Sequence, residues 1–99
     1  MKVRVVLPHH LKNLARVDGE VALSVEGPVS VQTILDALEN AYPMLKGTVR
    51  EHGTHKRRPR VRFYVCQEDI SHAPPDTPLP EAITSGNEPL IIIGAISGG

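Results

Sequence analysis

The last ten residues, 90–99, read LIIIGAISGG. Four consecutive apolar residues, three of them β-branched, are typical of a strand with neighbours on both sides. The run passes at once into small residues and ends in Gly98-Gly99. Because glycine makes up about 7% of residues, two terminal glycines arise by chance in roughly one chain in 200. The stretch therefore predicts a central strand that leads directly into a tail without bulky side chains.

Three earlier segments alternate apolar and polar residues, which predicts strands with one buried face. They are residues 2–7, residues 20–26 and the segment around Val61, Phe63 and Val65. We expect the first two to pair as antiparallel neighbours, and the segment between them, with Leu11, Leu14 and Ala15, to form a loop.

Between the second and third strands the apolar period changes to that of a helix, over residues 30–42. Ser30 is a good N-cap, and Thr33 in place of a glutamate predicts an incomplete capping box. Pro43 ends the helix because its ring excludes the helical conformation at the preceding residue. Residues 71–80 hold four prolines and predict a surface loop, followed by a short helical turn within 80–85.

The element order predicts an α+β fold in a single domain over residues 1–99. One main helix must bury its apolar stripe on a mixed four- to five-stranded sheet, with the last strand beside the first. This is the β-grasp, or ubiquitin-like, arrangement. A chain of 99 residues is long enough for one such domain. We expect residues 95–99 to form a flexible tail.

Composition limits the classes of function. The chain has 11 basic and 11 acidic residues and only 3% aromatic residues, so neither a nucleic acid nor a membrane is an expected partner. The lone Cys66 fits a reducing compartment, and the apolar N-terminal run stops at Pro8, so we expect a cytoplasmic protein. One cysteine without a metal-ligand motif predicts no metal site.

Local features point instead to protein contacts. Residues 55–62 are strongly basic, with Arg57, Arg58 and Arg60, and indicate a solvated loop or a docking patch for an acidic protein. The alternation predicts that one sheet face turns away from the helix and combines arginines with apolar residues, which is typical of a docking surface. Its predicted members are Arg4, Val6, Arg60, Arg62, Tyr64, Cys66 and alternate residues of 90–93. We interpret Cys66 as an ordinary outer residue of its strand.

These features resemble the MoaD/ThiS-type sulfur carrier proteins, a ubiquitin-like family whose members end in Gly-Gly. The resemblance covers nearly the whole chain. In that family a leucine-containing loop and a Gly-Asp-Glu turn precede the last strand, and Leu79 and Gly86-Asn87-Glu88 are similar to these. The ending Ile96-Ser97-Gly98-Gly99 is similar to the family's tail without its proline.

The resemblance implies that the chain is a protein cosubstrate and binds no cofactor itself. A ubiquitin-activating-type enzyme would use ATP and magnesium to adenylate Gly99, and a sulfur donor would convert it to a thiocarboxylate. Ile96, Ser97 and Gly98 would contact the partner's channel. The sulfur would then serve cofactor biosynthesis, with the large subunit of molybdopterin synthase as the expected partner. The alternative is a β-grasp interaction module or ubiquitin-like protein modifier that carries no sulfur.

Overall fold

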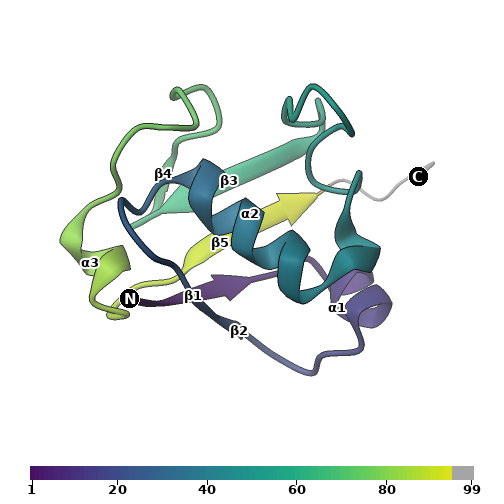
Figure 1. Cartoon of the computed structure of the whole chain (residues 1–99), viewed down its shortest axis with the longest axis horizontal. Coiled ribbons are helices and arrows are strands. Elements are labelled where there is room, and N and C mark those ends of the chain that lie inside the picture. The colour runs from purple at the N-terminus through teal and green to yellow at the C-terminus, as the bar shows by residue number, and fades with distance from the viewer. Residues whose placement is uncertain (95–99) are drawn as a thin grey trace.

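The computed structural model describes residues 1–94, which form a five-stranded sheet with the main helix across one face (Figure 1). The predicted tail, 95–99, lies outside the described residues. The strands are β1 (Lys2–Val6), β2 (Val21–Ser24), β3 (Val61–Val65), β4 (Glu68–Asp69) and β5 (Leu90–Gly94). The helices are α1 (His9–Ala15), α2 (Val31–Ala41), the 3₁₀ turn η1 (Pro43–Leu45) and α3 (Glu81–Thr84).

The sheet has the order β2-β1-β5-β3-β4. β1 and β5 are parallel, with Val6 opposite Ile91, whereas β5 is antiparallel to β3, with Phe63 opposite Ile92. The central position of β5 beside β1 confirms the prediction from its apolar run. The mixed sheet under one main helix confirms the predicted β-grasp class. Because β1 and β5 are parallel, their carboxyl ends lie at the same end of the sheet, next to α1 (Figure 1).

α2 begins at the predicted N-cap and its capping box is complete. The Ser30 hydroxyl accepts a hydrogen bond from the Thr33 amide, 3.2 Å away, and the Thr33 hydroxyl accepts one from the Ser30 amide, 2.9 Å away. The prediction of an incomplete box is therefore wrong, because a threonine hydroxyl performs the role of the usual carboxylate. The α2 residues Ile34, Leu35 and Leu38 are buried against the sheet.

The core is aliphatic except for one ring. It joins the inner residues of four strands to α2, and Leu45 of η1 and Ile83 of α3 add buried side chains beside it. The strand and helix members are Val3, Val5, Val21, Leu23, Val61, Phe63, Val65, Leu90, Ile92, Val31, Ile34, Leu35 and Leu38. Alternate burial along β1 and β3 leaves the intervening side chains on the opposite face of the sheet.

α1 occupies residues 9–15, where the sequence predicts a loop. Pro8 stands at its N-cap, where a missing amide hydrogen costs nothing, and Leu11 and Ala15, four residues apart, face the core. A helix of seven residues gives only two buried positions, so its apolar period is too short to recognise. The loop prediction is wrong because tertiary packing of Leu11 and Ala15 stabilises this helix, and such packing cannot be read from the apolar pattern of so short a segment.

The two-residue β4 is also absent from the prediction. Cys66 and Gln67 have φ values of 50° and 70°, and this pair of left-handed residues returns the chain so that Tyr64 lies opposite Asp69. Asparagine and glycine, which favour such a turn, are missing here. Cys66 is therefore an exposed turn residue, and its predicted place in the outer row of a strand is wrong.

The remaining elements agree with the prediction to within a few residues. The strands at 2–7 and 20–26 are shorter, at Lys2–Val6 and Val21–Ser24, and the turn predicted within 80–85 is α3. Within residues 1–94 no helix combines the length and apolar character needed to cross a bilayer.

Candidate docking surface and tail exit

The sheet face opposite α2 carries an apolar strip flanked by arginines, and we call it the outer face. Its centre is formed by pairs across the strands: Ile91 lies opposite both Val6 and Tyr64, and Ile93 lies opposite Arg62. Ile93 is 50% exposed. The outer face consists of Arg4, Val6, Arg62, Tyr64, Ile91 and Ile93. The predicted orientation is confirmed for these residues, and their role in binding stays a prediction.

Arg4 is already paired within the chain. Its guanidinium donates to both carboxylate oxygens of Glu20, at 2.9 and 2.7 Å, and to the carbonyl oxygens of Gly86 and Asn87, at 2.8 and 3.1 Å. The hydrogen bonds to Glu20 raise the pKa of Arg4 and lower that of Glu20. Arg4 thus fixes the turn before β5, in which Gly86 has φ +83°, a conformation that favours glycine.

Arg62 lies at the other border of the outer face. Its Nη1 is 3.6 Å from Asp69 Oδ2 and 3.2 Å from His72 Nε2. Hydrogen bonds from Ser71, together with the charges of Arg62 and His72, lower the pKa of Asp69. Both borders therefore hold satisfied polar groups around apolar side chains, which is the usual anatomy of a protein contact surface. Arg60, also predicted to be part of this face, is exposed just before β3.

β5 ends beside α1. A Cβ atom added to Gly94 would lie 3.6 Å from His10 Cε1 and 3.7 Å from Pro8 Cγ, so α1 borders the end of the strand. The buried Nδ1 of His10 has no hydrogen-bond partner among the described residues. The predicted site residues Ile96, Ser97, Gly98 and Gly99 lie outside the described residues. The outer face reaches this exit through Ile93, the residue before Gly94.

The basic segment is an ordered hairpin over residues 49–58. Arg58 donates its amide to Val49 O at 3.0 Å, and Glu51 donates to Lys56 O at 2.7 Å. The Arg57 guanidinium donates to four carbonyl oxygens, among them Ser71 O at 3.2 Å and Val61 O at 2.7 Å, and Arg58 Nε donates to Gly47 O. The half-buried Arg57 is therefore held by backbone carbonyls rather than fully solvated, whereas Arg58 is exposed as predicted, and the role of the segment as a docking patch stays a prediction.

Arg50 holds this hairpin to α2. Its side chain is 4% exposed; Nε donates to Glu39 Oε2 at 2.9 Å and Nη2 donates to Asp36 Oδ1 at 2.5 Å. Burial alone would lower the pKa of Arg50, but the hydrogen bonds that it donates to the two carboxylates outweigh this effect, so the pKa is raised. The sequence gives one clue, the two acids three residues apart on the helix, but it does not identify their partner.

Within residues 1–94 no three His, Cys, Asp or Glu side chains gather closely enough to hold a metal ion.

No family model and no curated protein sequence matches this chain. Solved structures do match. Small archaeal modifier protein 1 from Haloferax volcanii superposes with a TM-score of 0.76 over 100% of both chains, at 22% identity. The same protein from Methanosarcina acetivorans gives 0.71 over 99% of this chain and 96% of its own, at 26% identity.

A third match is CysO in the BexX/CysO complex of Amycolatopsis orientalis, with a TM-score of 0.72 over 98% of this chain and 99% of the other, at 21% identity. These neighbours confirm the resemblance on which the sequence interpretation rests, at the level of the fold. The chain is a ubiquitin-like β-grasp protein with the architecture of small archaeal modifier protein 1 and CysO.

Proposed function

We propose that this chain is a sulfur carrier protein whose working group is the Gly99 carboxylate. One observation carries the proposal: the central strand β5 contributes Ile91 and Ile93 to the outer face and then passes through Gly94 toward Gly98-Gly99. A partner bound to the outer face would therefore receive the tail at the adjoining edge. The full-length similarity to small archaeal modifier protein 1 and CysO supports this assignment.

The proposed chemistry needs no catalytic side chain from this protein. A carboxylate is a poor electrophile until one oxygen becomes part of a good leaving group. In the proposed cycle, a ubiquitin-activating-type enzyme binds ATP and magnesium and joins AMP to the Gly99 carboxylate, releasing pyrophosphate. The outer sulfur of a persulfide donor then displaces AMP and forms an acyl disulfide with Gly99. A second thiol of the donor system cleaves the S–S bond, which leaves the thiocarboxylate on Gly99 and a disulfide on the donor. The carrier acts as a protein cosubstrate and binds no cofactor itself.

We propose cofactor biosynthesis in the cytoplasm as the destination of the sulfur. The first candidate acceptor is the pterin precursor of molybdopterin, held by the large subunit of a molybdopterin synthase-like enzyme. Thiocarboxylate sulfur is a nucleophile, so the acceptor must offer an electrophilic carbon. The sulfur of one carrier replaces one leaving group on that carbon, and the carboxylate of Gly99 is regenerated by hydrolysis.

The mass of the intact chain tests the carrier function. After incubation with an activating enzyme, ATP, magnesium and a persulfide donor, we expect the chain to gain the mass difference between sulfur and oxygen, and fragmentation should place the change on Gly99. Omission of ATP is the control and should leave the mass unchanged.

The second candidate is a ubiquitin-like modifier, which the similarity to the small archaeal modifier proteins favours. Its product would be an isopeptide bond between Gly99 and a lysine of another protein. If the complete system yields only such conjugates and never a thiocarboxylate, the modifier function replaces the carrier function.

A single charge on the outer face should weaken activation. Ile93→Glu places a carboxylate in the apolar strip at a position that is 50% exposed, so the fold should persist while docking of the activating enzyme weakens, by about tenfold or more. The matched control is Met44→Glu, because Met44 is 47% exposed but lies on η1 away from the outer face. The KM of the activating enzyme for each variant, measured by pyrophosphate exchange, gives the comparison. Equal KM values for the two variants would place docking elsewhere.

A further inference from the structure

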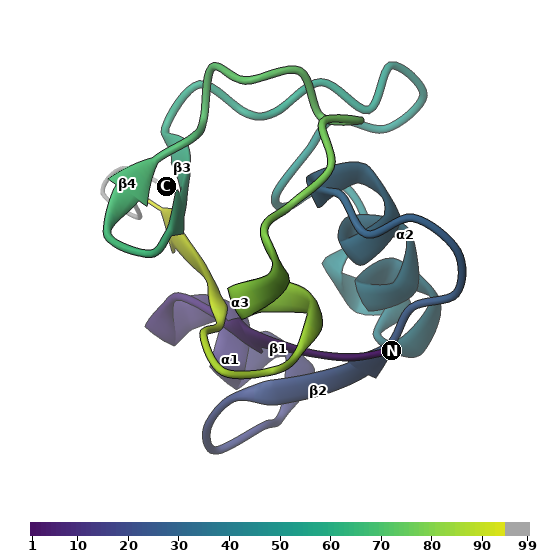
Figure 2. The same cartoon turned by 90° about the vertical axis from the view of Figure 1, so that its left-hand side faces the viewer.

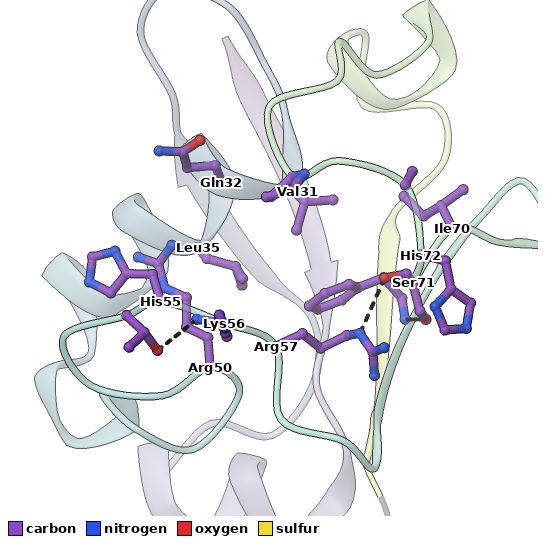
Figure 3. A pocket seen from close by; sticks show the side chains of 14 residues that line it. Val31, Gln32, Leu35, Arg50, His55, Lys56, Arg57, Ile70, Ser71 and His72 are labelled. Atoms are coloured by element: carbon purple, nitrogen blue, oxygen red, sulfur yellow. Dashed lines mark hydrogen bonds between the residues drawn. The ribbon is translucent and has the colours of Figure 1, made fainter.

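A pocket of about 440 Å³ opens on the α2 side of the molecule, between that helix, the hairpin 49–58 and the segment 70–75 (Figure 3). In Figure 3, Gln32 and Leu35 of α2 lie on one side of it, and Ile70, Ser71 and His72 lie on the other. Its volume is within the range of roughly 300–1,000 Å³ that is usual for small-molecule sites. None of its described lining residues belongs to the outer face.

The floor of the pocket is apolar. Phe63 of β3 contributes its ring, and Val31 and Leu35 of α2 and Ile70 surround it. Three of the four side chains are buried members of the core, so the floor is held by packing. This surface can take the flat or aliphatic body of an organic molecule.

The walls of the pocket are positively charged. Its described lining residues include Arg50, Lys56 and Arg57 but no aspartate or glutamate. The charge of Arg50 is balanced by the two carboxylates that it contacts. Lys56 and Arg57 pair with no carboxylate in the part of the chain that the structure describes. The hydrogen bonds of Arg57 all go to neutral carbonyl oxygens, and its Nη2 has no partner among the described residues.

We propose that this pocket binds a small organic phosphate with an apolar body. A phosphate monoester carries close to two negative charges near neutral pH, which would balance Lys56 and Arg57 together. The remaining Arg57 nitrogen suits a phosphate oxygen, because guanidinium donors match phosphate geometry. His55 and His72, which also line the pocket, add further donors. The apolar floor selects esters over inorganic phosphate.

This function is independent of sulfur transfer, because the pocket and the outer face lie on different sides of β3. Phe63 points to the helix side, whereas its neighbours Arg62 and Tyr64 belong to the outer face. A ligand in the pocket and a partner on the outer face can therefore be present together. The experiment needs only the isolated chain, so its failure would leave the carrier proposal untouched.

The test is a titration of the ¹⁵N-labelled chain with three probes: phenyl phosphate, phenol and inorganic phosphate. We expect phenyl phosphate to shift the amide signals of residues 31–35, 54–57 and 70–73 in a saturable way. Phenol lacks the charge and inorganic phosphate lacks the apolar body, so each should bind at least about tenfold more weakly. No saturable shift with phenyl phosphate, shifts outside these segments, or binding of phenol or inorganic phosphate as tight as that of phenyl phosphate would each overturn the proposal.

One isosteric variant tests the charge requirement. Gln32→Glu adds a carboxylate to the pocket wall on an exposed side chain in the first turn of α2, where an acid is compatible with the helix. We expect about tenfold weaker binding of phenyl phosphate. Gln67→Glu, the same change in the β3–β4 turn outside the pocket, should alter binding less than twofold. Lys56→Gln should weaken it severalfold. Equal effects of the two glutamates, or unchanged binding in Lys56→Gln, would overturn the proposal.

Discussion

Replacing Gly98 by alanine is expected to reduce ATP–pyrophosphate exchange by the activating enzyme about a hundredfold or more, with an unchanged melting temperature. The added methyl group restricts the backbone angles open to glycine and widens a segment that, in the proposed function, must enter a narrow channel. Displacement of a reacting group by about 1 Å is enough for an effect of this size. Stability should not respond, because β5 ends at Gly94, four residues earlier.

The matched control is Gly19→Ala, the same substitution in the connection before β2. A Cβ atom at Gly19 meets nothing within 4 Å, and the residue lies far in sequence from the tail. Exchange and melting temperature should both remain normal in this variant. Normal exchange in Gly98→Ala would remove the physical reason for treating the Gly98-Gly99 ending as the working end. A fall in its melting temperature would show instead that the substitution disturbs the fold.

The sequence predicts well those parts of the fold that local patterns determine. The apolar run of β5 predicts a central strand because an uninterrupted apolar run is typical of a strand with neighbours on both sides, even though only Leu90 and Ile92 of the run are buried. The residues of α2 repeat their apolar period often enough to be recognised, and Ser30 and Pro43 mark its ends. The outer face follows from the same alternation, since burial of Val3 and Val5 requires that Arg4 points away from the core.

The parts that the sequence does not predict depend on contacts between distant segments. The Arg57 guanidinium donates to carbonyl oxygens of Ser71 and Val61, which come within reach of it when the chain folds. The composition of the basic segment shows none of these contacts, so it suggests a solvated charge at Arg57. Arg4 likewise binds carbonyl oxygens more than 80 positions along the chain. The pocket combines three segments, none of which carries a recognisable motif. Figure 2 shows two of them, the hairpin after α2 and the loop before α3, overlapping at the top of the view, on the side away from β2.

Arg50→Met is expected to cost about 3–5 kcal/mol of unfolding free energy, because it leaves a buried carboxylate without its counter-charge. Glu39 is the reason for the size of the effect, since its side chain is only 12% exposed, whereas Asp36 is 51% exposed and can be hydrated. Methionine keeps most of the apolar stem, so lost packing contributes little. Denaturant unfolding at neutral pH measures the change, which would be a large share of the total for a chain of this size.

A second variant separates charge from shape. In the double variant Arg50→Met/Glu39→Gln neither side chain carries a charge. About half or more of the lost unfolding free energy should therefore return, because most of the cost of Arg50→Met comes from the unpaired Glu39 carboxylate and not from the loss of the ion pair itself. If the double variant is no more stable than Arg50→Met, the arginine acts through its hydrogen bonds to the helix and not through charge balance. In both variants the hairpin 49–58 loses the contacts of Arg50 with Asp36 and Glu39 of α2. The outer face lies on the side of the sheet opposite α2, so it does not depend on these contacts. The folded fraction of Arg50→Met should therefore bind phenyl phosphate poorly and still be activated at Gly99, which would establish that the two sites are independent.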